Sequence, residues 1–209
     1  MYGIENYIGF LASAIVLNLT PGLDTIYILT RSLSQGKSAG LVSVAGIMSG
    51  CVIHVLCAAF GLSLILSTSA LVFSLIKWAG AGYLIYLGIR MTFSKNSSLD
   101  ILPMSNPSRD LVKIYKQGVL TNVLNPKVGL FFLSFLPQFI DPNQTYGVIP
   151  FLILGSTFLV TGTIWCLFLT LAAAFMTDAL RRHPKAGTVL EKLSGLIFIG
   201  FGLKLAYDK

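Results

Sequence analysis

Charged side chains are scarce in this sequence. Only 11% of the 209 residues are Asp, Glu, Lys or Arg, whereas an ordinary soluble domain has about 25%. Hydrophobic residues make up 55% of the chain, and the mean hydropathy is +0.79. A soluble fold of this size could not cover its surface with so few polar groups. The composition therefore excludes an ordinary soluble protein and predicts an integral membrane protein.

The sequence also lacks the motifs of common enzyme classes. It has no HExxH zinc motif and no phosphate-binding loop. Asp24 is the only clear acid deep in an apolar stretch, so no carboxylate pair stands ready for acid–base catalysis. The odd number of cysteines argues against a disulfide framework, and Cys51 with His54 would supply only two metal ligands. We therefore expect neither an enzyme nor a metal site.

Long runs without charge predict membrane-spanning helices. Residues 38–76 and 142–177 form runs of 39 and 36 residues without a charged side chain. A helix needs about 20 apolar residues to cross the hydrocarbon. Residues 1–6 contain no Lys or Arg, so we expect the first apolar stretch to be a retained span and not a secretory signal. Turn and breaker residues divide the chain into six expected spans, at about 7–30, 41–66, 71–91, 114–137, 148–177 and 190–207.

The basic residues orient these spans. Six spans place ten of the fifteen Lys and Arg residues in loops on one side, which the positive-inside rule identifies as cytoplasmic. The opposite connections, 67–70 and 138–147, contain none, so both termini are expected outside. The net charge of +7 then indicates attraction to anionic lipid and not to nucleic acid. The ten residues are Arg31, Lys37, Arg90, Lys95, Arg109, Lys113, Lys116, Arg181, Arg182 and Lys185.

The two halves of the chain resemble each other. The sequence LTPG at 19–22 is similar to LNPK at 124–127, in the first and fourth expected spans. Because each half has three spans, the second copy enters the membrane in the opposite orientation, as in many secondary transporters. We expect one domain, 1–209, with repeat one at about 1–93, a cytoplasmic linker at about 94–112 and repeat two at about 113–209. A second match, at identical spacing, pairs Lys77, Gly80, Tyr83 and Tyr86 with Lys192, Gly195, Phe198 and Phe201.

The fold class predicted is all-α, with six transmembrane helices in a 3+3 inverted repeat and helices 1 and 4 broken at proline. Pro21 would free the carbonyl of Leu17, and Pro126 would free that of Asn122. Freed carbonyls suit a cation and the N-termini of half-helices suit a carboxylate, although a plain packing kink is the alternative. The residues at the breaks expected to bind substrate are Thr20, Pro21, Gly22, Asn125 and Pro126.

Two charged residues lie beside the expected breaks. Asp24 is about two turns inside the cytoplasmic end of the first span, and intramembrane carboxylates are usually functional. It could hold a substrate ammonium, carry a coupling proton, or form a structural ion pair. Lys127 follows the second proline directly and could attract a substrate carboxylate, pair with Asp24, or extend to the membrane interface.

His54 shares a helical stripe with Gly46 and Gly50, at steps of four residues. Glycines allow close helix approach, so this histidine should face protein. It is a second candidate for proton coupling, because an imidazole changes charge near neutral pH, or else a packing residue. Secondary candidates for the site are Asn18, Lys77 and Tyr83, and Thr161 and Trp165 would shape the pocket if they face it.

These motifs resemble the lysine-exporter (LysE) superfamily, specifically its homoserine/threonine-exporter (RhtB) branch. The likeness rests on NLTPGLD at 18–24, on NPK at 125–127, and on the aromatic run to Phe139. Leu23 stands where members typically have a second proline. The resemblance implies a bacterial inner-membrane exporter of small neutral or basic amino acids or derivatives, such as threonine, homoserine or homoserine lactone. It also implies proton antiport without a cofactor, and often a homodimer.

Two other functions stay open. One is export of a metal or inorganic cation, as in more distant branches of the superfamily, which would need more ligands than Cys51, His54 and Asp24. The other is a membrane redox carrier, which would need a pair of cysteines able to cycle between thiol and disulfide.

Overall fold

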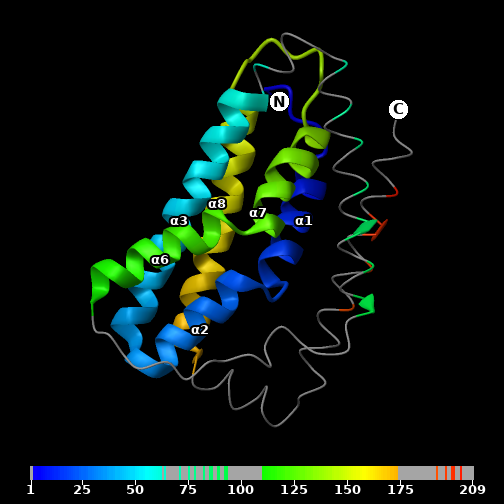
Figure 1. Ribbon diagram of the computed structural model, residues 1–209. Coiled ribbons are helices and arrows are strands. Elements are labelled where there is room, and N and C mark those ends of the chain that lie inside the picture. The colour runs from blue at the N-terminus through cyan, green and yellow to red at the C-terminus, as the bar shows by residue number, and fades with distance from the viewer. Residues whose placement is uncertain are drawn as a thin grey trace.

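The computed structural model describes residues 2–62 and 110–173 continuously, and only isolated positions elsewhere. The regular elements of these two stretches are all helices (Figure 1). They are α1 (Tyr7–Leu19), α2 (Leu23–Gln35), α3 (Lys37–Leu56), the π-helix η1 (Cys57–Leu62), α6 (Leu111–Val123), α7 (Pro126–Leu130), the π-helix η3 (Phe131–Phe135), the 3₁₀-helix η4 (Leu136–Phe139) and α8 (Ile149–Leu171).

Four helical units in the described stretches are long and apolar enough to cross a membrane. Two are continuous: α3 with η1 has 26 residues and α8 has 23. The other two are bent pairs, α1 with α2 at 48° and α6 with α7 to η4 at 45°. The predicted breaks in the first and fourth spans are confirmed, although the first unit runs to Gln35, five residues beyond the expected end. The expected spans at about 71–91 and 190–207 lie outside the described residues apart from isolated positions. The total of six spans therefore stays a prediction.

Each bend arises where a proline interrupts the backbone hydrogen bonds. α1 ends at Leu19, and α2 begins only after the extended residue Gly22. α6 ends at Val123, and Pro126 takes the first position of α7, where its missing N–H costs nothing. The side chain of Asn125 accepts a hydrogen bond from the backbone N–H of Lys127 at 3.1 Å and so caps α7.

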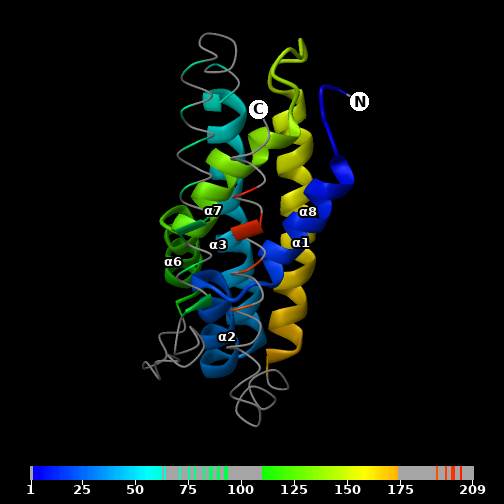
Figure 2. The same cartoon turned by 90° about the vertical axis from the view of Figure 1, so that its right-hand side faces the viewer.

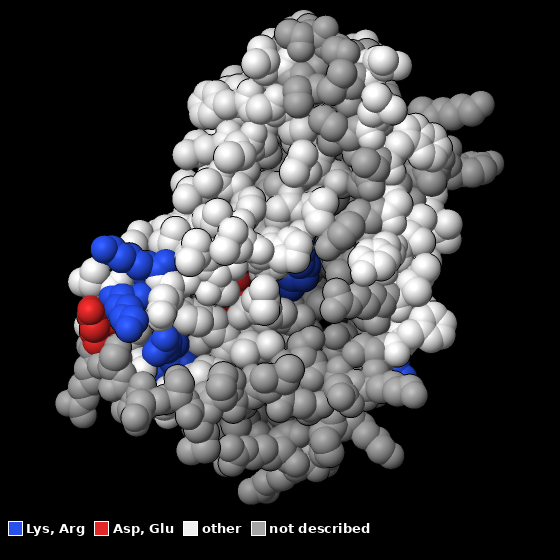
Figure 3. All heavy atoms as spheres, in the orientation of Figure 1, with Lys and Arg blue, Asp and Glu red and all other residues white. Residues whose placement is uncertain are grey.

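The four units alternate in direction, as the colours of Figures 1 and 2 show. α1–α2 and α8 run from the end that holds the N-terminus to the opposite end, and α3 and α6–α7 run back. At the N-terminal end, Glu5 N donates to Phe139 O at 2.8 Å and Asp141 N donates to Gly3 O at 2.9 Å. At the opposite end, Arg31 of α2 donates to Gln117 of α6 at 2.6 Å. Most of the Lys and Arg side chains, blue in Figure 3, gather near the start of α6, at the end opposite the N-terminus.

The tightest helix contact joins α3 to α6 through glycines. A Cβ at Gly46 would collide with the carbonyl oxygen of Tyr115, and one at Gly50 would lie 2.8 Å from the carbonyl oxygen of Val119. The tyrosine hydroxyl of Tyr115 also donates to Ser49 at 2.8 Å. The expectation that this stripe allows close approach is confirmed, and its partner is a helix of the same chain.

The packing of Gly46 can be tested with a single methyl group. We expect Gly46→Ala to lower the free energy of unfolding by roughly 1–3 kcal/mol, because the obstructing atom is main chain and can move only with α6. Thermal unfolding of the purified protein in detergent would measure this. Gly61→Ala is the matched control, since a Cβ there meets no atom within 4 Å. Equal melting temperatures for the two variants would contradict the packing.

A cluster of phenylalanine rings joins α1, η3 and α8 on the N-terminal side of the breaks. The ring of Phe131 lies 5.9 Å from that of Phe10 and 4.9 Å from that of Phe158, measured between centroids. Phe10 is fully buried, and Phe131 is 3% exposed. These contacts hold the segment after Pro126 against α1 and α8, and so bring the two breaks together.

Candidate functional site

The side chain of Lys127 connects the second break to the first. Its Nζ donates to the carbonyl oxygen of Thr20 at 2.9 Å and to that of Leu17 at 3.3 Å. The carbonyl of Leu17 is the one that Pro21 leaves without its helical partner. The first break therefore binds an ammonium group, and in this structure the protein itself supplies it.

Asp24 lies in the first turn of α2, on the other side of the first break. Its Oδ2 accepts a hydrogen bond from Asn122 Nδ2 at 2.9 Å. Lys127 donates to carbonyls and, within the described stretches, makes no hydrogen bond to Asp24. Four buried atoms of the described site, Asp24 Oδ1, Asn122 Oδ1, Asn125 Nδ2 and Trp165 Nε1, have no hydrogen bond of standard geometry. The Asn125 amide lies close enough to the Asp24 carboxylate to interact with it, so the capacity left for a ligand is that of Asn122 and Trp165.

His54 reaches the second break from α3. Its Nε2 lies 3.1 Å from the carbonyl oxygen of Asn122, which Pro126 leaves without its helical partner. The imidazole is stacked on the ring of Phe132, with 6.1 Å between centroids and 7° between planes. The carbonyl of Asn122 also accepts from the backbone N–H of Asn125 at 2.9 Å, so His54 is an additional partner there, whereas the Leu17 carbonyl is bound by the side chain of Lys127. This contact meets the expectation that His54 faces protein, and its part in proton coupling stays a prediction.

Asp24, Asn122 and Lys127 border one small cavity between the four units. Its volume is about 30 Å³, room for about one or two water molecules and too little for an amino acid. The cavity must therefore widen before it can hold such a substrate. The other described lining residues are Leu17, Asn18, Thr25, Ile47, Met48, Cys51, Val128, Phe158, Trp165 and Cys166.

The remaining predicted residues divide into three groups. Thr20 is fully buried at the first break, and a Cβ on Gly22 would lie 3.1 Å from Lys127 Nζ. Asn18 lines the cavity and donates to Thr161 Oγ1 of α8 at 3.1 Å. Lys77 and Tyr83 lie outside the described residues, so their positions stay predictions.

The side chain of Asn122 was missed by sequence reasoning, which considered only its carbonyl. An amide one turn before an intramembrane proline was the available signal, because polar groups in a span need partners. All three cysteines are free; Cys51 and Cys166 are buried at the cavity and Cys57 is exposed. Among the described residues, no group of three or more His, Cys, Asp or Glu side chains could hold a metal ion.

Comparison with known families identifies the chain. Residues 15–209 match the model of the LysE type translocator family. The chain belongs to this family. Members of the LysE family are transporters, so the protein is a membrane transporter and not an enzyme. The apolar helices of the fold agree with a multi-pass membrane protein.

Similar LysE-type proteins align with nearly the whole chain. A leucine efflux protein of Salmonella choleraesuis (strain SC-B67) is 30% identical, and the alignment covers 98% of this chain and 96% of that protein. A leucine efflux protein of Klebsiella pneumoniae is also 30% identical, with the same coverage. The membrane protein YrhP of Bacillus subtilis is 31% identical over 96% of this chain and 98% of its own. No solved structure matches the chain.

Proposed function

We propose that the protein is a secondary-active exporter of a neutral amino acid of the leucine type, working by proton antiport in the bacterial inner membrane. The observation that carries this proposal is the ammonium of Lys127 on the carbonyls of Leu17 and Thr20, beside the carboxylate of Asp24. A site that holds an ammonium next to an acid has the chemistry that an amino-acid zwitterion requires. The leucine efflux relatives favour an aliphatic side chain over the threonine or homoserine first expected.

The substrate ammonium would compete with Lys127 for the first break. When it binds the carbonyl of Leu17 and the carboxylate of Asp24, the lysine is released and can pair with the substrate carboxylate. The backbone N–H groups that begin α2 and α7 support the same carboxylate through the positive ends of their helix dipoles. Ile47, Met48 and Phe158 supply an apolar wall for the substrate side chain.

The directions of the described units support a 3+3 inverted repeat. α1–α2 runs opposite to α6–α7, its proposed counterpart, and α3 runs opposite to α8 (Figure 1). The site then lies where the repeats meet, and rocking of one repeat against the other would open the cavity to each side in turn. The end with the basic residues faces the cytoplasm, and both termini face outside.

Asp24 is the proposed coupling group, since it would bind the substrate ammonium and a proton in turn. His54 is the second candidate, through its contact with the carbonyl of Asn122. The proton gradient supplies the energy, so no cofactor is required. In this proposal, lipid covers the apolar outer faces of the helices. Two copies of the chain form a homodimer.

The function can be tested with purified protein in proteoliposomes. We expect vesicles loaded with labelled leucine, isoleucine, threonine, homoserine, lysine or arginine to release the aliphatic amino acids when a pH gradient is imposed. Release should slow when the gradient is dissipated with an ionophore. Flat traces for every amino acid would overturn the proposed substrate class.

A further inference from the structure

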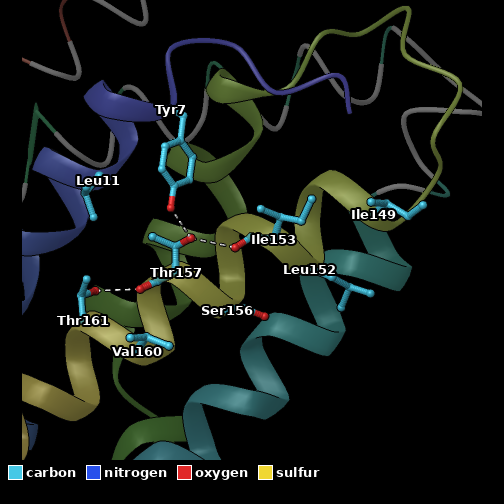
Figure 4. A pocket seen from close by; sticks show the side chains of 9 residues that line it. All are labelled: Tyr7, Leu11, Ile149, Leu152, Ile153, Ser156, Thr157, Val160 and Thr161. Carbon is cyan, nitrogen blue, oxygen red and sulfur yellow. Dashed lines mark hydrogen bonds between the residues drawn. The ribbon is translucent and has the colours of Figure 1, made fainter. Parts of the chain in front are cut away.

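A second and larger space lies between α1 and α8. Figure 4 shows this groove, which has a volume of about 610 Å³ and falls within the range of small-molecule sites. Its lining residues come from the first half of α1 and from Ile149 to Thr161 of α8, and both of these segments begin at the end of the fold that holds the N-terminus (Figure 1). Its described lining has no charged side chain: Leu11, Ile149, Leu152, Ile153 and Val160 are aliphatic, and Tyr7, Ser156, Thr157 and Thr161 carry hydroxyls.

The hydroxyls form a track along the groove. The hydroxyl of Tyr7 lies 3.0 Å from Thr157 Oγ1, which donates to the carbonyl of Ile153 at 2.9 Å. One turn further along α8, Thr161 Oγ1 donates to the carbonyl of Thr157 at 2.9 Å (Figure 4). Thr157 and Thr161 already donate their single hydroxyl hydrogens to carbonyls of α8, so their oxygens are left as acceptors that suit the ammonium of a zwitterion.

A hydrogen bond between α1 and α8 lies between this groove and the small cavity. Asn18 lines the cavity and Thr161 lines the groove, and Asn18 Nδ2 donates to Thr161 Oγ1 at 3.1 Å. The helices are close here, because a Cβ on Gly162 would lie 3.2 Å from Asn18 Oδ1. The hydrogen bond therefore holds α1 against α8 at the point where the cavity lining meets the groove lining.

We infer that the groove is the outward half of the transport path, where a neutral aliphatic amino acid binds after it leaves the small cavity, and that the Asn18–Thr161 hydrogen bond is the gate between them. This inference rests on the proposed function and its orientation. The aliphatic wall suits the substrate side chain, and the hydroxyl track leads its polar groups away from Asn18.

The groove is tested by filling it. We expect Ser156→Trp to lower leucine efflux by about tenfold or more, because an indole would occupy space on the path. Ile164→Trp is the matched control on the same helix, since Ile164 is 64% exposed and does not line the groove; it should leave efflux within about twofold. Normal efflux by Ser156→Trp would show that the groove is only a lipid-facing surface and would overturn the inference.

The gate is tested by thiol accessibility, which needs no substrate. Cys166 is 7% exposed at the small cavity, and Cys57→Ser removes the exposed cysteine. In that background, an impermeant thiol reagent is added outside and the rate at which it modifies the cavity thiols is measured. We expect Thr161→Val to raise this rate by about fivefold, which is the factor that the loss of one hydrogen bond would give. Thr163→Val is the control, because among the described residues the Thr163 hydroxyl binds the carbonyl of Leu159 on its own helix and no group of α1.

The two readouts separate the possible failures. Equal modification rates in Thr161→Val and Thr163→Val would overturn the gate even where leucine efflux is normal. Faster modification in Thr161→Val, together with no efflux of any amino acid by the wild type, would keep the gate and overturn the proposed substrate.

Discussion

Asp24→Asn should lower amino-acid efflux by about hundredfold or more, the equivalent of roughly 2.7 kcal/mol in the barrier. The substitution keeps the shape of the side chain but removes the charge that would bind the substrate ammonium and the site that would carry the proton. Asn122 could still donate to the new amide oxygen, as it now donates to Asp24 Oδ2 at 2.9 Å. The measurement is efflux of labelled leucine from proteoliposomes under a pH gradient, at equal protein content.

Asp110→Asn provides the matched control for this experiment. Asp110 caps α6 by accepting from the backbone N–H groups of Val112 and Lys113, and it is exposed. Asparagine caps helices equally well, so the same chemical change should leave transport within about twofold. Wild-type rates in Asp24→Asn would remove this carboxylate from the mechanism.

Lys127→Met should lower leucine efflux by about tenfold to hundredfold, because a hydrogen bond to a charged group is worth roughly 1.5–3 kcal/mol. The variant leaves the carbonyls of Leu17 and Thr20 without the ammonium that they now bind, and it removes the proposed partner of the substrate carboxylate. Efflux and the apparent affinity for leucine would both be measured.

A substrate analogue separates the two parts played by this lysine. An amine with the leucine side chain and no carboxylate should inhibit Lys127→Met at least as strongly as the wild type, because the variant lacks the competing ammonium, whereas leucine should inhibit only the wild type strongly. Lys113→Met, at an exposed position near the start of α6, is the control for loss of a positive charge. Equal leucine affinity in wild type and Lys127→Met would exclude a direct part for Lys127 in binding the carboxylate.

The broken spans and the glycine stripe were predictable because their causes are local. A proline lacks its N–H wherever it lies, so a break near residue 21 or residue 126 needs no knowledge of the rest of the fold. Likewise, three residues at steps of four share a face of any helix. The structure shows both features, with bends of 48° and 45° and with α6 against Gly46 and Gly50.

The partners of the polar groups could not be predicted in the same way. Lys127 Nζ and the carbonyl of Leu17 are 110 residues apart, and Asn18 and Thr161 are 143 apart. A lysine side chain has a flexible four-carbon stem, so the sequence left three destinations open for Lys127: a substrate carboxylate, Asp24 and the membrane interface. Tertiary packing gave it a fourth, the carbonyls of Leu17 and Thr20, by placing the second break against the first.

The sequence by itself determined an apolar, all-helical membrane protein of the LysE family, the positions of two helix breaks and a single acid beside one of them. These properties depend on composition, on the backbone chemistry of proline and on short motifs. Only the tertiary structure decided that the ammonium of Lys127 occupies the first break, that Asn122 binds Asp24, and that Asn18 at a cavity of about 30 Å³ donates to Thr161 at a groove of about 610 Å³. These features depend on distances between segments that are remote in the chain, and such distances are set by how the helices pack.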